Sequence, residues 1–361
     1  MQAGNRLVSL DVFRGITMAA MVVVNTPGDW DTVYAPLLHA PWHGWTPTDL
    51  IFPFFLFIVG VSITLSKRSA SVGSILRRAA VILGVGLFLS GFPPFDLATW
   101  RIPGVLQRIA VCYAAAGVLY TRSRRPAVIG AVAAALMLGY WLVMRLVPVP
   151  GGTAGDLSPD GNLGAFIDRA LMLGHLWKPT WDPEGLLSTI PAVATTLFGI
   201  LAGLWIGGNA PPARKAATLA LAGAGALAVG QAWGVLFPIN KSLWTSSYVM
   251  FSAGAGALFL ALCYWTIDVK GWRWWTKPFV ILGVNALALY ALSSLLAGAL
   301  ARIHVNLDDG RAVSLSSLIY TSAFEPLASP KNASLLYALA NLAVLFVILL
   351  WMYRRRIFLR A

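Results

Sequence analysis

The sequence predicts an all-α protein, folded as a polytopic bundle of about ten transmembrane helices. Of its 361 residues, 58% are hydrophobic and only 11% are charged, whereas a soluble domain carries about 25% charged residues. A helix that crosses a bilayer needs roughly 20 mostly apolar residues, and the chain contains about ten such runs. They cover residues 8–25, 49–66, 75–92, 104–121, 126–146, 187–207, 214–236, 246–267, 278–299 and 334–353. Because no long polar stretch separates the runs, residues 1–361 are expected to form a single domain.

The first, second and fourth runs contain polar residues where such residues are costly. Asp11 and Arg14 lie three positions apart on one face of the first run, and they favour a permanent helix over a cleavable signal peptide. Asp49 begins the second run, where a carboxylate caps a helix N-terminus. Gln107 and Arg108 lie one to two turns inside the fourth run. Polar residues in hydrocarbon are candidate functional residues, although Asp11 and Arg14 could equally pair with each other at the inner interface.

Two later segments interrupt the series of apolar runs. Residues 147–186 contain "PVPGGTAGDLSPDGNLG", which is expected to form a flexible surface hairpin. Residues 300–333 contain "SLSSLIYTSAF", a short apolar piece that could form a re-entrant or interfacial helix and could bring the helix count from ten to eleven. Asn285 lies midway through the ninth run. The simplest explanation for a polar side chain there is a hydrogen bond to a neighbouring helix of the bundle.

The distribution of charge predicts the orientation of the bundle. The net charge is +13, but Lys and Arg concentrate in alternate loops, as the positive-inside rule requires of cytoplasmic loops. These basic segments are Arg6, 67–78, 122–125, 214–215, 270–277 and 354–360. Both termini are therefore expected in the cytoplasm. The lipid bilayer accounts for the basic charge, and no nucleic-acid partner is implied.

The loops predicted on the outer side have an unusual composition, with many polar and aromatic residues. All four histidines fall on this side, together with segments 92–104, 175–191 and 237–248, which are rich in Trp, Pro, Asp and Asn. Any single Trp here could equally be an interfacial anchor. Chemistry is therefore expected on the outer face or just below it.

Neither the histidines nor the cysteines predict a metal centre or a disulfide. His39 and His43 have a spacing that would suit a metal on a helix, but Pro41 between them makes a regular helix improbable. Cys112 and Cys263 each fall inside an apolar run, where a lone cysteine is usually a small apolar residue.

Six blocks of the sequence, taken in order, resemble one known family. They are "SLDVFRG", "HAPWHGWTPTDLIFPFFLFIVG", "RIPGVLQRIAVCY", "DPEGLLSTIPA", "PINKSLWTSSY" and "GVNALALY". Together they resemble the heparan-α-glucosaminide N-acetyltransferase family of transmembrane acyltransferases. The resemblance implies transfer of acetyl from cytoplasmic acetyl-CoA to the amino group of a glucosamine-type sugar on the other side of the membrane.

The resemblance also implies a setting for this reaction. The lysosomal enzyme has a lumenal N-terminal domain and a preceding helix, and we expect neither in this chain. The expected acceptor is therefore a small amino sugar rather than a heparan-sized chain. A multi-pass protein of a bacterial inner membrane, with its active site towards the periplasm, is expected, and a homodimer is implied by the family.

The resemblance assigns three catalytic residues. The family's active-site histidine corresponds to His39, in "HAPW", and not to His43, which we expect to be an interfacial neighbour. His39 would act as general base or as acetyl carrier, because an imidazole accepts a proton near neutral pH. Asn25 would donate a hydrogen bond to the developing oxyanion. Asp49 would orient the imidazole or hold the sugar amine.

Residues for the two substrates follow from the same topology. The phosphates of acetyl-CoA need a cationic cradle at the inner side, and guanidinium groups bind phosphate in a bidentate manner. The candidates for the donor are Arg14, Arg77, Arg78, Gln107, Arg108 and Asn285. The candidates for the acceptor are Trp45, Trp100, Arg101, Asp182, Glu184, Asn240, Lys241 and Trp244.

Two other functions compete with acetyl transfer. In a transporter or permease for an amino sugar, Asp11, Arg14 and Arg108 would gate a route through the membrane, although the inverted repeats of many transporters are not evident. A non-catalytic membrane scaffold is the third reading, and it would gain no stability from CoA.

Overall fold

The computed structural model describes residues 7–66, 71–307 and 312–359. Of the basic residues assigned to the cytoplasmic side, Arg6, Lys67, Arg68 and Arg360 lie outside the described residues. The longer helices are α1 Val8–Asn25, α2 Ile51–Leu65, α3 Val72–Gly91, α4 Val105–Arg122, α5 Pro126–Leu146, α7 Leu186–Gly207, α8 Pro212–Trp233, α9 Ser246–Cys263, α11 Ala286–Arg302 and α13 Pro330–Arg354. The shorter ones are α6 Leu163–Met172, α10 Lys277–Val284 and α12 Leu315–Ile319, and a π-helix, Tyr264–Val269, continues α9.

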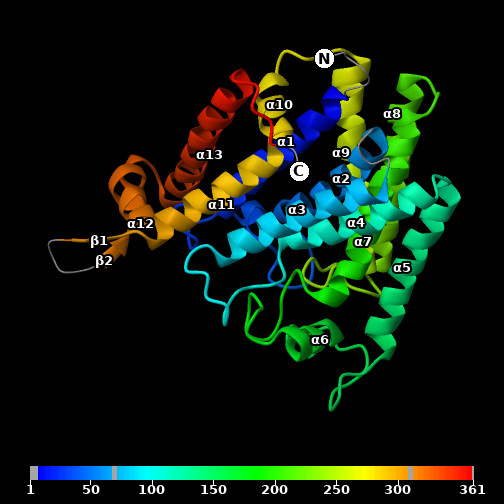
Figure 1. The fold of residues 1–361 in the computed structure, drawn as a ribbon, viewed down its shortest axis with the longest axis horizontal. Helices are drawn as coiled ribbons and strands as arrows, with labels where there is room; N and C mark the ends of the chain where they lie inside the picture. Colours follow the sequence, from blue (N-terminus) through cyan, green and yellow to red (C-terminus); the bar gives the residue numbers. More distant parts are fainter. Residues whose placement is uncertain (1–6, 67–70, 308–311, 360–361) are drawn as a thin grey trace.

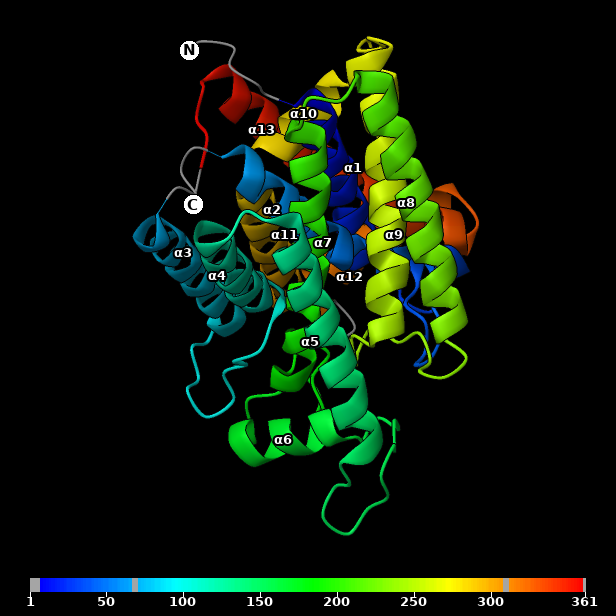
Figure 2. The same cartoon turned by 90° about the vertical axis from the view of Figure 1, so that its right-hand side faces the viewer.

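The predicted all-α membrane bundle is confirmed. Among the described residues, eight helices are long and apolar enough to cross a membrane, and the bent pair α10–α11 makes nine if it counts as one span. Helix α4 falls outside this group, because Gln107, Arg108 and Arg122 make it less apolar. The start of α1 and the end of α13 lie at one end of the bundle, and α6 lies at the opposite end (Figure 2).

The ninth predicted span is wrong as a single straight helix. Its two halves, α10 and α11, meet at an angle of 80°. The break is at Asn285, whose φ of −117° and ψ of 37° are not helical. The side chain of this buried residue binds the C-terminal segment instead: Nδ2 donates to the carbonyl oxygen of Ile357 (3.0 Å), and Oδ1 accepts from the backbone N–H of Leu359 (3.1 Å). These two tertiary hydrogen bonds satisfy the Asn285 side chain at the point where the helix is interrupted.

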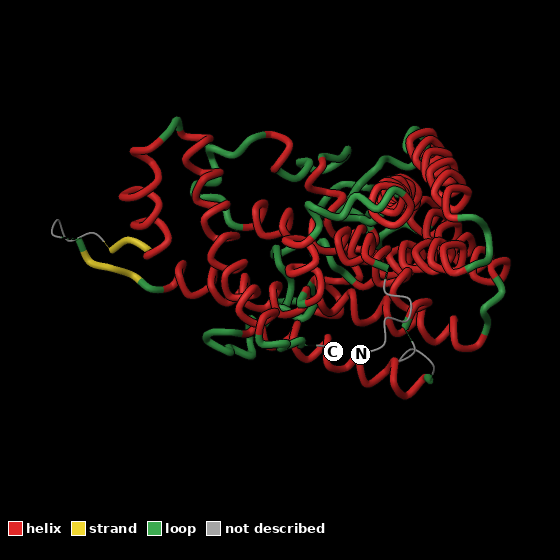
Figure 3. Tube along the Cα trace, turned by 90° about the horizontal axis from the view of Figure 1, so that it is seen from above, coloured by secondary structure: helices red, strands yellow, loops and turns green. Residues whose placement is uncertain are grey.

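The segment 300–333 forms an arm and, within the part of it that the structure describes, adds no eleventh span. Strands β1 His304–Asn306 and β2 Ala312–Ser314 pair antiparallel and lie at the far end of the arm beyond α11 (Figures 1 and 3). The predicted apolar piece forms only α12 and a π-helical turn, Tyr320–Phe324, before α13 begins.

The segment 147–186 is more ordered than a flexible hairpin. It contains α6, which begins where the Asn162 side chain accepts a hydrogen bond from the backbone N–H of Ala165 (2.8 Å). Leu163, Asp168 and Met172 on this helix are buried. The expectation of a surface hairpin therefore missed a short amphipathic helix that packs against α7.

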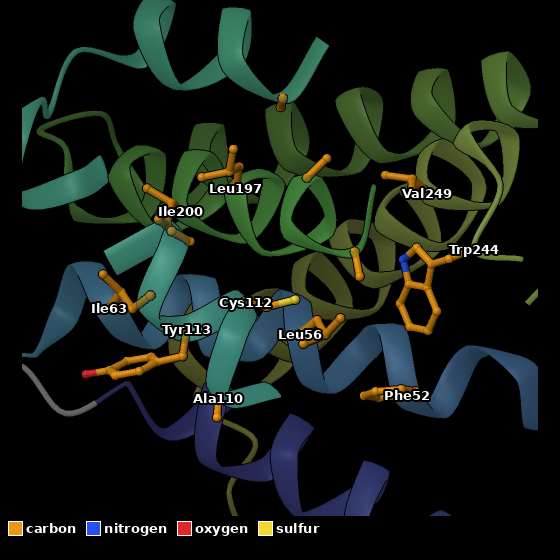
Figure 4. Close-up of a cluster of buried hydrophobic side chains, with 14 of the residues drawn as sticks. Phe52, Leu56, Ile63, Ala110, Cys112, Tyr113, Leu197, Ile200, Trp244 and Val249 are labelled. Atoms are coloured by element: carbon orange, nitrogen blue, oxygen red, sulfur yellow. The ribbon is translucent and has the colours of Figure 1, made fainter. Parts of the chain in front are cut away.

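The helices of the core approach each other closely where they carry glycine. A Cβ at Gly60 of α2 would lie 2.0 Å from the carbonyl oxygen of Thr196, and one at Gly199 of α7 would lie 2.0 Å from that of Phe57. Small residues allow such backbone contact between membrane helices. Figure 4 shows the apolar cluster beside this contact, built from Phe52, Leu56, Ile63, Cys112, Tyr113, Leu197, Ile200, Trp244 and Val249.

Candidate active site

The candidate catalytic pair lies on the connection between α1 and α2. His39 Nδ1 lies 2.6 Å from Oδ1 of Asp49. Asp49 is 2% exposed, and its second oxygen accepts hydrogen bonds from the backbone N–H groups of Ala40 (3.0 Å) and Thr46 (2.9 Å). These donors hold the carboxylate in place, so that the proton of the pair belongs on Nδ1 of His39. The lone pair of Nε2 is then available for chemistry.

The turn that carries Asp49 is itself held by the core. Residues Pro47–Leu50 form a 3₁₀ turn, and Thr46 and Asp49 close a capping box across it. The hydroxyl of buried Tyr248, on α9, donates to the backbone carbonyl oxygen of Asp49 (2.5 Å). His39 itself remains accessible, with 49% of its side chain exposed. The pair thus combines a fixed carboxylate with a reachable imidazole.

The loop between α8 and α9 brings two further residues to the histidines. Asn240 is buried; its Nδ2 donates to the carbonyl oxygen of Trp42 (2.9 Å) and lies 3.3 Å from Nδ1 of His43. Its Oδ1 accepts from the backbone N–H of Leu243 (2.8 Å). Partial burial lowers the pKa of His43 below its ordinary value, which favours the neutral ring that accepts this hydrogen bond. Asn240 is therefore engaged by the protein, and a sugar would have to displace these contacts.

Lys241 approaches His39 from the same loop. Its Nζ lies 3.3 Å from Nε2 and 3.5 Å from Nδ1 of the imidazole. Desolvation lowers the pKa of Lys241, while the charges of Glu184 and Asp49 oppose that shift. Lys241, predicted for the acceptor, thus lies against the predicted catalytic histidine.

Arg101 forms a charge cluster with the segment that leads into α7. Its Nε and Nη2 donate to the two oxygens of Asp182 (2.8 and 2.7 Å), and Nη2 also donates to Glu184 (2.5 Å). These carboxylates raise the pKa of Arg101 despite its desolvation. The sequence predicted all three residues for the acceptor, and the structure brings them together.

Arg108 is buried below this cluster. Nη2 donates to Ser188 Oγ (2.5 Å) and to the carbonyl oxygen of Gly185 (3.1 Å). Its guanidinium carbon lies 5.0 Å from the ring centroid of Trp244. Trp244 is fully buried, so its face supports Arg108 and is not available to stack on a sugar.

The remaining predicted residues of the outer side differ in accessibility. Trp45 is 42% exposed, and its ring lies 4.6 Å from that of Phe251. Trp100 is half-buried, because its Nε1 donates to the carbonyl oxygen of Leu87 on α3 (2.8 Å). Asn25 is the last residue of α1, and its side chain is exposed. No hydrogen bond joins Asn25 to His39 in the described part of the chain.

A cavity of about 660 Å³ opens between α1, α2, α3, α4 and α11. Polar groups line one end: Nη2 of Arg14 donates to Ser62 Oγ (2.8 Å), and Nη1 contacts Asp11 (3.3 Å). Arg78 also lines it, with its guanidinium carbon 5.2 Å from the ring centroid of Tyr113. The Nε of Arg78 is buried and lacks a hydrogen-bond partner among the described residues.

Four predicted donor residues do not line this cavity directly: Arg77, Gln107, Arg108 and Asn285. Arg77 is exposed on the other face of α3. Gln107 is buried, and its Nε2 donates to Ser90 Oγ (3.0 Å), which ties α4 to α3. Asn285 acts through the C-terminal segment, since it holds Ile357 and Leu359, and Leu359 lines the cavity.

The cavity extends along α4. Its lining includes Val105, the first residue of α4, and Tyr113, which lie about 12 Å apart along the helix at 1.5 Å per residue. Tyr290 of α11 lines it too. The cavity thus runs from Arg78, beside Tyr113, to the start of α4, which follows Arg101 in the chain.

Sequence reasoning missed several of these residues. Ser62, Tyr113 and Tyr290 line the cavity, and Tyr248 holds the turn of Asp49. Each is one of several hydroxyl-bearing residues in its apolar run, so residue type alone did not single it out. Among the described residues, no group of three or more His, Cys, Asp or Glu side chains could hold a metal ion.

Comparison with known proteins gives one consistent match. The family model for heparan-alpha-glucosaminide N-acetyltransferase, catalytic, matches residues 6–231. The human heparan-alpha-glucosaminide N-acetyltransferase is 31% identical over 352 residues, which cover 79% of this chain and 52% of the relative. The mouse protein of the same name is 30% identical over 354 residues, covering 80% and 53%. The chain therefore spans about half the length of these curated relatives.

Proposed function

The chain belongs to the heparan-alpha-glucosaminide N-acetyltransferase catalytic family, and on this premise we propose that it transfers acetyl from acetyl-CoA to the amino group of a small glucosamine-type sugar. The observation that carries the proposal is the contact of 2.6 Å between His39 Nδ1 and buried Asp49. It orients an accessible imidazole in the way that general-base and nucleophilic catalysis require. The charge cluster and the long cavity support the proposal.

The inner cavity suits the donor. Arg14 and Arg78 stand at its polar end, and the unpartnered Nε of Arg78 is a donor that a phosphate oxygen would satisfy. The apolar walls of α2 and α4 suit a narrow acyl-bearing arm. A volume of about 660 Å³ is in the range of ligand sites, so that the arm would lie in the cavity while the nucleotide stays near the arginines.

The outer cluster suits the acceptor. The carboxylates of Asp182 and Glu184 can bind sugar hydroxyl or ammonium groups, while Arg101 fixes their positions. The exposed ring of Trp45 offers an apolar face for a sugar ring. Asn240 would bind the sugar only after rearrangement, because the protein engages its side chain. Asn25, exposed at the end of α1, stays the proposed donor to the oxyanion.

The membrane setting belongs to the same proposal. We place the helices in a bacterial inner membrane, with His39 towards the periplasm, because the basic loops and the histidine loops lie on opposite sides of the predicted bundle. The homodimer implied by the family stays a prediction.

Acetyl transfer by the purified protein tests the proposal. The protein in lipid nanodiscs is mixed with radiolabelled acetyl-CoA and glucosamine, beside the variants His39→Ala and His304→Ala. His304 is the matched control, since it is an exposed histidine on β1 of the arm. Labelled N-acetylglucosamine is expected from the wild type and from His304→Ala only. Equal product from His39→Ala would refute the role of His39, and glucosamine uptake into vesicles without acetylation would favour a transporter.

A further inference from the structure

The position of Lys241 leaves the reactive nitrogen of His39 open. The Nζ of Lys241 is almost equally distant from Nε2 (3.3 Å) and from Nδ1 (3.5 Å). The two ring nitrogens flank one carbon and point in different directions. A group nearly equidistant from both must lie beside the ring rather than along the lone-pair axis of Nε2. Lys241 therefore adjoins the site of reaction without blocking it.

The charges that face Lys241 come from several elements. Glu184 precedes α7 and Asp49 precedes α2, and both favour the ammonium form. Arg108 of α4 and Arg101 of the outer loop favour the neutral amine, as does desolvation, which is the largest effect. The pKa of Lys241 is therefore lowered from its ordinary value, and a lysine with a lowered pKa can serve as a base.

An acetyl group carried on His39 creates a need for a second base. Once Nε2 is acylated, its lone pair is used, and Nδ1 is held by Asp49. The acceptor amine must nevertheless lose a proton when it attacks. We propose that Lys241 is the general base of the second half-reaction, in which acetyl passes from His39 to the acceptor amine. This inference rests on the function proposed above.

The two half-reactions balance without any further reagent. In the first, Nε2 attacks the thioester carbonyl, an N–C bond forms, the C–S bond breaks, and CoA leaves as a thiolate. Asp49 then faces the acetyl-imidazolium through the N–H of Nδ1. In the second, the amine attacks the acetyl carbon, its proton passes to Nζ of Lys241, and the bonding pair returns to Nε2. Water removes the proton from Lys241, and the thiolate takes up one proton from solvent.

Three variants separate a base from a fixed charge. Lys241→Met removes the amine. Lys241→Arg keeps a long cationic side chain, so it controls for an effect of the substitution on folding. The arginine cannot lose its proton near neutral pH, so it cannot act as a base. Lys178→Met is the matched control, because Lys178 is an exposed lysine of the same outer side that lies over the ring of Trp177 (4.7 Å).

Each variant is assayed in both half-reactions. The first half-reaction is measured as the burst of free CoA thiol in the absence of acceptor, together with the label that becomes bound to the protein. The second half-reaction is measured as transfer to glucosamine, and then to hydroxylamine, a weakly basic amine whose attacking nitrogen gives up its proton to water without a stronger base. Both Lys241 variants should keep a full burst but transfer to glucosamine about 100-fold more slowly or worse, the scale of general-base catalysis. Hydroxylamine should restore transfer to within about threefold of the wild type, and Lys178→Met should match the wild type throughout.

Several results would overturn the inference. Undiminished transfer by Lys241→Arg would mean that a fixed charge suffices. Loss of the burst in Lys241→Arg would assign Lys241 to the first half-reaction or to folding. Wild-type transfer without burst or protein-bound label would exclude the acetyl carrier, and with it the need for a second base. If the wild type releases no CoA and acetylates no amine, the proposed function itself fails.

Discussion

Replacing Asp49 by Asn should abolish acetyl transfer while leaving the fold intact. The carboxylate accepts four contacts: from His39 Nδ1, from the backbone N–H groups of Ala40 and Thr46, and from the Thr46 hydroxyl. Asn has one acceptor oxygen. Turning its NH₂ towards Ala40 and Thr46 would leave two buried N–H groups without partners, at about 1–3 kcal/mol each. The NH₂ should therefore face His39.

This orientation reverses the tautomer of the imidazole. The Asn amide donates to Nδ1, so that the proton of the ring moves to Nε2, and the lone pair needed for reaction is lost. The equivalent change in a Ser-His-Asp triad lowers kcat roughly 10⁴-fold, about 5.4 kcal/mol in activation free energy. Asp49→Asn should thus lose most activity, although its thermal unfolding should stay close to that of the wild type.

The assay is acetylation of glucosamine at saturating acetyl-CoA, with thermal unfolding of the same samples. Asp96→Asn is the control, since Asp96 is an exposed aspartate in the loop between α3 and α4 that accepts hydrogen bonds within its own turn. A rate for Asp49→Asn within threefold of the wild type would refute the role of the His39–Asp49 pair. A collapse of thermal stability would instead show that the charge of Asp49 is needed for folding.

Four further predictions concern other parts of the molecule. Arg101→Lys should raise the KM for glucosamine about tenfold, because an ammonium cannot reproduce the bidentate contact with Asp182. The CoA burst should not change. An unchanged KM would show that the cluster is not part of the acceptor site. CoA at 100 times its Kd should stabilise the wild type by about 2.7 kcal/mol, measured by thermal unfolding with and without CoA. A tenfold loss of CoA affinity in Arg14→Gln should reduce that gain by about 1.3 kcal/mol at the same CoA concentration. Burial raises the pKa of Asp168 to about 6, so the stability of the wild type relative to Asp168→Asn should fall as pH rises from about 4 through 6; unfolding scans with no pH-dependent difference would contradict this. Asn285→Ala should lower stability by about 1–3 kcal/mol and speed amide exchange at 353–359, since its side chain bonds Ile357 and Leu359; unchanged exchange there would mean that packing alone holds this segment.

Helix positions could be predicted where a long apolar run made a helix the only structure available to the segment. The first run was expected at 8–25, and α1 is Val8–Asn25. In hydrocarbon every backbone N–H and C=O must be bonded within the segment, so a long apolar run becomes a helix. The same rule failed in the ninth run, because Asn285 is compatible with a continuous helix until its side chain finds Ile357 and Leu359, more than 70 positions away.

Short amphipathic elements were harder to predict than long apolar ones. Helix α6 carries the signal of an Asn162 cap followed by "LGAFIDRALM", but ten residues among Gly, Pro and Asp resemble a loop. Its burial of Asp168 depends on the start of α7, where the backbone N–H of Leu186 donates to that carboxylate (2.9 Å). Neither the burial nor its partner is visible in the local pattern.

The candidate site, too, was only partly predictable from the sequence. His39 and Asp49 are ten positions apart, and the sequence by itself determined the membrane-bundle class, the family and the block that holds this pair. It did not determine that Lys241, 202 positions from His39, would lie against the imidazole. Nor did it determine that Trp244 would be buried under Arg108, or that Arg14 and Arg78 would share a cavity and Arg77 would not. Composition and local order specify which segments enter the membrane, because each segment must satisfy its own backbone there. Which side chains meet depends on how the helices pack, and only the tertiary structure decides that.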